Sequence, residues 1–166
     1  MGDARVAAAT VKQFWATSAS IASQSAEKKP IEKQKSGILS DTKDLTTIRI
    51  ATIVEKMKYD TPELTVKAGK KIKLTFANPD FMPHNIVLVN PGKLEAIATA
   101  AIALGAEGFN VGFVPKSSDV IWARKLIDHG KEQVIEFTAP TTPGDYPYVC
   151  TFPGHHLLMR GVLHVK

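Results

Sequence analysis

The sequence predicts an all-β fold, a β-sandwich that carries one helical insertion and an N-terminal extension. From residue 47 onward, short segments of alternating or continuous apolar residues are separated by Gly and Pro. One segment, residues 93–104, is instead rich in Ala and Leu and contains neither Gly nor Pro. Residues 1–46 are rich in Ala, Ser, Thr, Lys and Gln. We therefore expect one domain over residues 47–166, preceded by a separate segment.

The N-terminal segment, residues 1–46, allows two interpretations. Val6, Val11, Phe14 and Trp15 can form one face of a short helix. Around residues 26–36 charged residues and a proline take over, which is typical of a linker. We expect this extension to be partly helical or disordered.

The β-strands of the domain follow from its apolar pattern. Residues 48–54 alternate, and Leu64 and Val66 lead through the turn Ala68-Gly69 into another alternating run. Residues 84–89 form a continuous apolar run after their first two positions, as in a buried strand. Further strands are expected at residues 72–76, 120–127, 133–137, 146–150 and 161–165. The helix over residues 93–104 should end at Gly105, and residues 108–115 should form a loop.

The composition excludes several classes of function. The formal net charge of +5 is spread along the 166 residues, without the interleaved basic and aromatic residues of a nucleic-acid-binding surface. The longest low-charge stretch is too short to span a bilayer, so we expect no requirement for membrane association. The N-terminus lacks the apolar run of a secretory signal, so a protein working outside the cytoplasm would have lost its leader or be part of a longer chain.

The only cysteine lies in the C-terminal run Cys150-Thr-Phe-Pro-Gly-His-His-Leu-Leu-Met159. A thiolate, an imidazole and a thioether within ten positions are ligands that copper selects. Cys150 should lie at a strand end, and Pro153-Gly154 should turn the chain so that His155 faces the same point. His156 is the alternative ligand, although adjacent histidines point in different directions. Met159 is either a weak axial ligand or a core residue.

A second histidine must come from elsewhere in the chain. His84 is the best candidate, because it opens a strand and is followed by Asn85, a polar residue at the mouth of an apolar run. We expect His129 to be exposed in a turn and His164 to lie on the surface of the last strand.

Other chemistry is less well supported by these residues. A Cys/His pair can act as a nucleophile and its base, but no orienting carboxylate or oxyanion-hole loop accompanies the pair here. Zinc is compatible with these ligands, but Met is a poor zinc ligand. The sequence therefore predicts a copper protein that is not an enzyme.

The motif Cys150-Thr-Phe-Pro-Gly-His155-x-x-x-Met159 resembles the ligand loop of azurins and auracyanins, and Met82-Pro-His84-Asn85 resembles the upstream ligand motif of cupredoxins. The resemblance runs from about Thr47 to Lys166 and implies a Greek-key β-sandwich. It implies one type 1 copper per chain, with His84, Cys150 and His155 as equatorial ligands and Met159 as the axial ligand.

The same resemblance implies roles for neighbouring groups. Asn85 would tie the two ligand loops together and donate toward the Cys150 sulfur, and the backbone N–H of Phe152 would be a second donor. Azurins usually have Gly where this chain has Pro83, so an approach of that carbonyl to the metal stays open. The chain also lacks the cysteine pair of the usual azurin disulfide.

A type 1 copper with no open position suits electron transfer, with the exposed edge of His155 as the exit. A surrounding apolar patch would dock redox partners such as a cytochrome or a copper/haem oxidoreductase, outside the cytoplasm. The residues expected in this patch are Met82, Phe113, Pro115, Pro153 and Leu157. The alternatives are an electron-transfer domain of a larger redox enzyme and a copper-binding module without a redox role.

Overall fold

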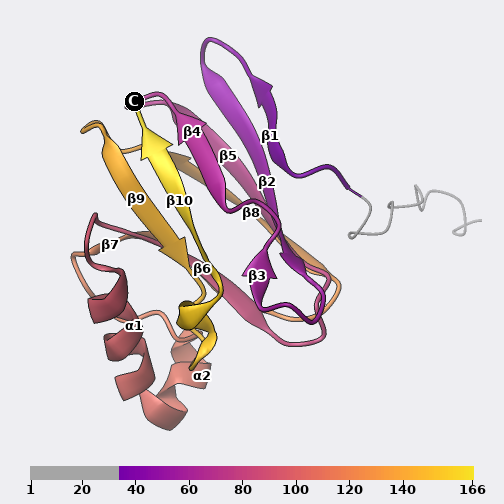
Figure 1. The fold of residues 1–166 in the computed structure, drawn as a ribbon, viewed down its shortest axis with the longest axis vertical. Coiled ribbons are helices and arrows are strands. Elements are labelled where there is room, and N and C mark those ends of the chain that lie inside the picture. The colour runs from indigo at the N-terminus through magenta and orange to yellow at the C-terminus, as the bar shows by residue number, and fades with distance from the viewer. Residues whose placement is uncertain (1–33) are drawn as a thin grey trace, which may run out of the picture. The chain divides into compact units, whose positions relative to one another are not determined.

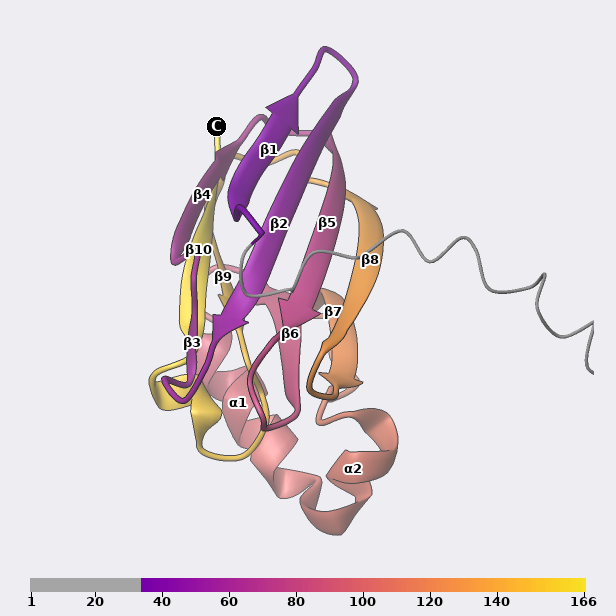
Figure 2. The same ribbon diagram turned by 90° about the vertical axis from the view of Figure 1, so that its right-hand side faces the viewer.

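The computed structural model describes residues 34–166 of the chain. In this range two five-stranded sheets face each other, with a helical insertion at one end (Figures 1 and 2). The predicted β-sandwich with a helical insertion is therefore confirmed. The expectations for residues 1–33 lie outside the described residues.

The first sheet is formed mainly by the N-terminal half of the domain. β2 and β5 pair in parallel, and the other pairs are antiparallel. Its strands, in spatial order, are β1 (Gly37–Asp41), β2 (Leu45–Ile53), β5 (Lys71–Asn78) and β8 (Lys131–Thr138), with β3 (Lys58–Tyr59) also paired to β2. The sheet thus begins at Gly37, inside the segment expected to be an extension. β1 is mostly exposed and lacks the apolar alternation that reveals the other strands.

The second sheet contains the strands that lead to the C-terminal motif. β4 and β10 pair in parallel, and the remaining pairs are antiparallel. Its strands, in spatial order, are β4 (Glu63–Val66), β10 (Arg160–Val165), β9 (Gly144–Val149), β6 (His84–Val89) and β7 (Val120–Ile127).

β6 is buried along its whole length, because it is covered on both faces. Ile86 and Leu88 point into the core between the sheets. Val87 and Val89 point the other way and pack with Ile97 of helix α1 (Leu94–Ala103). This double cover explains why the strand lacks the polar alternation of a half-exposed strand.

The insertion continues beyond α1 through the short helices η2 (Gly105–Glu107) and α2 (Gly108–Val111). The expectation of a loop over residues 108–115 is therefore wrong for its first four residues. Glycine is required at position 108, because the ring of Phe113 packs directly against it and an added Cβ would lie 2.2 Å from the ring. Within residues 34–166, no single helix is long and apolar enough to cross a membrane. The bent pair Leu94–Ala103 and Gly105–Val111 reaches the required length and apolar composition only when its two helices are taken together.

The register between β6 and β9 brings distant segments together. Val87 lies opposite Val149, and Leu88 lies opposite Tyr148. β6 therefore begins beside the point where β9 ends. Both views place α1 and α2 at the same end of the sandwich as the loop between β9 and β10 (Figures 1 and 2).

Candidate metal centre

Three side chains converge where β6 begins and β9 ends. His84 is the first residue of β6, and Cys150 directly follows β9. His155 begins the short helix η3 (His155–Leu157). Gly154, with a φ of 83°, makes the left-handed turn before η3, and the backbone N–H of His155 donates to the Phe152 carbonyl at 3.0 Å. The chain after Cys150 thus folds back toward the thiol.

The three potential donor atoms form a compact triangle. Nδ1 of His84 lies 3.2 Å from Nδ1 of His155, and the Cys150 sulfur lies 3.8 Å and 3.6 Å from these two nitrogens. A point equidistant from all three lies about 2 Å from each, close to the bonds that zinc forms with nitrogen and sulfur. One sulfur and two imidazole nitrogens are also the equatorial donors of a blue-copper site. The residues present therefore fit a copper ion.

Burial keeps all three groups uncharged in the metal-free chain. Burial raises the pKa of the Cys150 thiol to about 11, although hydrogen bonds partly offset it. Burial, together with the nearby His84, lowers the pKa of His155 to about 4. Burial also lowers the pKa of His84, although its hydrogen bond to Asp80 opposes the shift. At neutral pH the site therefore holds a thiol and two neutral imidazoles.

Asn85 joins the two ligand-bearing segments. Its side-chain oxygen accepts from the Thr151 N–H, and its amide nitrogen donates to the Thr151 hydroxyl, both at 2.8 Å. The same nitrogen donates to the Gly112 carbonyl at 2.8 Å, which ties in the helical insertion. Because Asn85 and Thr151 are buried, removal of either side chain would leave polar atoms of the other without a hydrogen-bond partner.

The Cys150 sulfur accepts hydrogen bonds from the backbone N–H groups of Asn85 and Phe152. The resemblance to cupredoxins implies the same two residues as donors to this sulfur. The side chain of Asn85, by contrast, is hydrogen-bonded to Thr151 and Gly112. Backbone donors fix the direction of the sulfur because they cannot rotate away.

Met159 lies directly before β10 and is fully buried. Its carbonyl accepts from the Cys150 N–H at 3.0 Å, and its N–H donates to the His155 carbonyl at 2.8 Å. The backbone thus holds Met159 beside two of the three donor residues.

The remaining histidines lie apart from this triangle. His155, and not His156, belongs to the convergent group. His129 is exposed in the β7–β8 turn and stacks on Phe81. His164 pairs across strands with Asp145 at 2.7 Å.

The surface around His155 is partly as expected. Met82, Pro153 and Leu157 are exposed. Phe113 and Pro115 are buried, so their assignment to an exposed patch is wrong. The Phe113 ring packs against Gly108 and against the ring of Phe152.

Two exposed side chains that the sequence analysis missed extend this surface. Phe109 is 65% exposed and contacts the ring of Phe152, and Leu158 is 52% exposed directly after η3. His155 itself is only 4% exposed. We use the name apolar rim for the exposed apolar side chains on the two ligand-bearing segments and on the insertion, which are Met82, Phe109, Pro153, Leu157 and Leu158.

Asp80, to which the sequence pattern assigns no role, also contacts a donor residue. Its Oδ2 accepts from Nε2 of His84 at 2.9 Å, and the carboxylate is buried. Burial alone would raise the pKa of Asp80, but hydrogen bonds from His84 and two backbone N–H groups hold it below its ordinary value. The only signal in the sequence is its position four residues before His84.

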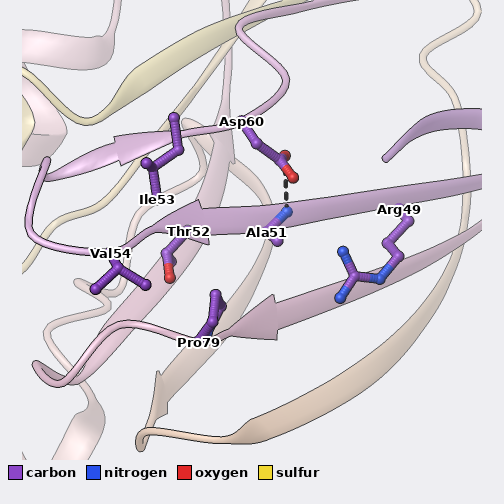
Figure 3. A pocket seen from close by; sticks show the side chains of 7 residues that line it. All are labelled: Arg49, Ala51, Thr52, Ile53, Val54, Asp60 and Pro79. Atoms are coloured by element: carbon purple, nitrogen blue, oxygen red, sulfur yellow. Dashed lines mark hydrogen bonds between the residues drawn. The ribbon is translucent and has the colours of Figure 1, made fainter. Parts of the chain in front are cut away.

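A hollow of about 260 Å³ lies beside the end of β2 (Figure 3). Its charged side chains hold neighbouring segments: Asp60 accepts from the Ala51 N–H at 2.9 Å, and Arg49 donates to Ser36 at 3.1 Å. None of the three donor residues lines it; its walls are formed by Arg49, Ala51, Thr52, Ile53, Val54, Asp60 and Pro79.

Known proteins share both this fold and this site region. Residues 47–166 match the family described as copper binding proteins, plastocyanin/azurin family. The chain is 39% identical to Auracyanin-A of Chloroflexus aurantiacus over 122 residues, covering 72% of this chain and 74% of that protein. It is 31% identical to an azurin of Pseudomonas aeruginosa over 120 residues, covering 68% and 80%.

A solved structure agrees with these sequence comparisons. The structure described as auracyanin A, a "blue" copper protein from Chloroflexus aurantiacus, superposes with a TM-score of 0.67 at 36% identity. The match covers 74% of this chain and 99% of that one.

The protonation states of the three donors predict the proton balance of metal binding. Cu(I) binding at pH 7 should release about one proton per chain, because the thiol must ionise while the neutral imidazoles lose none. Calorimetry in buffers of different ionisation enthalpy measures this number. Cys150→Ser should abolish the release, and release of two or more protons would contradict the assigned states.

Proposed function

Because the chain belongs to the plastocyanin/azurin family of copper-binding proteins, we propose that it carries single electrons through one type 1 copper. His84, Cys150 and His155 would hold the ion, with Met159 as a weak axial donor. The observation that carries this proposal is the triangle of three donor atoms, all within 4.8 Å of one another and all buried. When bound, copper supplies one-electron chemistry between Cu(I) and Cu(II).

The surroundings of the triangle support electron transfer rather than catalysis on a substrate. The donor residues are between 0% and 4% exposed, which leaves little room for a substrate molecule. Asn85 and the backbone N–H groups at the sulfur hold the ligands in one arrangement. A rigid ligand set favours fast electron exchange, because little has to move when the charge changes.

His155 is the natural exit for the electron. It is the only one of the three donors with any exposed surface, and it lies next to Pro153 and Leu157 of the apolar rim. A small apolar surface allows brief contact with a partner, since transient redox encounters bury little area. We propose a cytochrome or a copper/haem oxidoreductase as the partner, and a location outside the cytoplasm. Both proposals are supported by the family alone.

Adding Cu(II) should give an intense visible thiolate-to-copper band. Cys150→Ser should lose the band, because the serine oxygen cannot supply that charge transfer. Optical titration measures both. His155→Ala should also lose it, whereas the matched variant His156→Ala should keep it. A pale or colourless wild-type complex would rule out a blue-copper site.

Met159→Leu should keep the colour and raise the reduction potential. The side chain has similar volume, but it lacks the thioether that stabilises the more highly charged ion. Voltammetry measures the shift. The control is Met57→Leu, which changes an exposed methionine outside the site. An unchanged potential in Met159→Leu would show that Met159 is not an axial ligand.

Leu157→Asp should slow electron exchange with a reduced c-type cytochrome at least severalfold and leave the optical spectrum nearly unchanged. When the partner docks, the new carboxylate would have to be desolvated, and this costs free energy that weakens the contact. Stopped-flow mixing measures the rate. Leu39→Asp, on the exposed strand β1, should have no such effect. Equal rates in wild type and Leu157→Asp would place the exit elsewhere.

A further inference from the structure

The buried carboxylate of Asp80 contacts His84, the first of the three donor residues in the chain. Asp80 lies in the connection between β5 and β6, and it is 3% exposed. Its Oδ2 lies 2.9 Å from Nε2 of His84. Its Oδ1 accepts from the backbone N–H of Phe81 at 2.8 Å and of Glu55 at 3.1 Å. Both oxygens therefore have assigned partners, and only one of them faces the histidine.

This contact determines which nitrogen of His84 faces the other donors. An ionised carboxylate accepts hydrogen bonds and donates none, so the proton of the ring must lie on Nε2. Nδ1 then keeps its lone pair, and it points toward the Cys150 sulfur and Nδ1 of His155. A ring with the opposite tautomer would present an N–H to the metal position and could not bind there.

We propose that Asp80 is a positioning residue of the copper site, which fixes the ligating tautomer of His84 and sets the reduction potential through its negative charge. This inference rests on the proposed function, because it assigns a role toward the same metal. A fixed negative charge next to a ligand stabilises the more highly charged state of a bound ion. Asp80 should therefore lower the reduction potential.

Asp80 is held in place by a second set of hydrogen bonds. Its backbone N–H donates to the Asn78 side-chain oxygen at 3.1 Å and to the Thr52 hydroxyl at 3.3 Å. The Asn78 amide nitrogen in turn donates to the carbonyls of Met82 at 2.8 Å and Ile127 at 2.9 Å. Thr52 also lines the hollow beside β2 (Figure 3). The carboxylate is thus prepositioned independently of a metal ion.

Asp80→Asn tests the proposal sharply, because the two oxygens of Asp80 have different partners. The amide oxygen should stay with the backbone N–H groups of Phe81 and Glu55, which leaves the amide nitrogen facing Nε2 of His84. Two donors would then oppose each other unless His84 moves its proton to Nδ1. The variant should bind Cu(I) at least tenfold more weakly in competition with a colorimetric chelator.

The copper-loaded variant should also have a higher reduction potential. The increase should be about 59 mV for each factor of ten by which the Cu(II) affinity falls more than the Cu(I) affinity. Asp128→Asn is the matched control, because it removes one exposed carboxylate from the adjacent β7–β8 turn. The control should keep both the affinity and the potential of the wild type. Wild-type affinity and potential in Asp80→Asn, or equal changes in Asp128→Asn, would overturn the proposal.

If Asp80→Asn does not fold, a measurement on the wild-type chain decides whether His84 has the tautomer that the proposal requires. Nitrogen-15 NMR of the metal-free full chain should show His84 protonated at Nε2, and a His84 ring protonated at Nδ1 would overturn the proposal. Failure of the proposed function is a distinct result, since the wild type itself would then give no intense blue band.

Discussion

The antiparallel register between β6 and β9 is the constraint on which the rest of the site depends. Val87 lies opposite Val149, and continuing that register places Asn85 opposite Thr151, where two buried hydrogen bonds of 2.8 Å join the two residues. A slip of one residue would turn the side chains of β6 to the opposite face and leave these groups unpaired. The same register sets His84 beside Cys150, so one pairing specifies both the core and the donor triangle.

This constraint explains how the site can be arranged before a metal binds. Burial keeps the thiol and both imidazoles neutral, so no charge repulsion separates them. The loop from Cys150 to Met159 is closed by backbone hydrogen bonds, and the Asp80 carboxylate holds the far side of His84. Folding therefore supplies the geometry that a metal would otherwise have to impose. The helical insertion completes the enclosure, because Phe113 packs over Gly108 and against Phe152.

Where local pattern decides the structure, the sequence is a good guide. The strand over residues 84–89 and the helix near residues 93–104 follow from apolar runs and a terminal glycine. The residues of the donor triangle follow from two motifs, one around His84 and one from Cys150 to Met159. Tertiary contacts decide the rest. β1 pairs with β2 although β1 is exposed. Phe113 and Pro115 are buried in the folded domain. Asp80 contacts His84 only because the imidazole ring turns its Nε2 toward the carboxylate. None of these contacts leaves a periodic signal.

The central claim is that the folded chain presents one sulfur and two imidazole nitrogens to a single copper ion and holds them there in both oxidation states. X-ray absorption at the copper edge, recorded on the oxidised and the reduced protein, tests this claim most directly. We predict the same ligand set in both states, one sulfur and two imidazole nitrogens, with nearly unchanged bond lengths. A spectrum without a short copper–sulfur bond, or a change in the number of strong ligands on reduction, would contradict it.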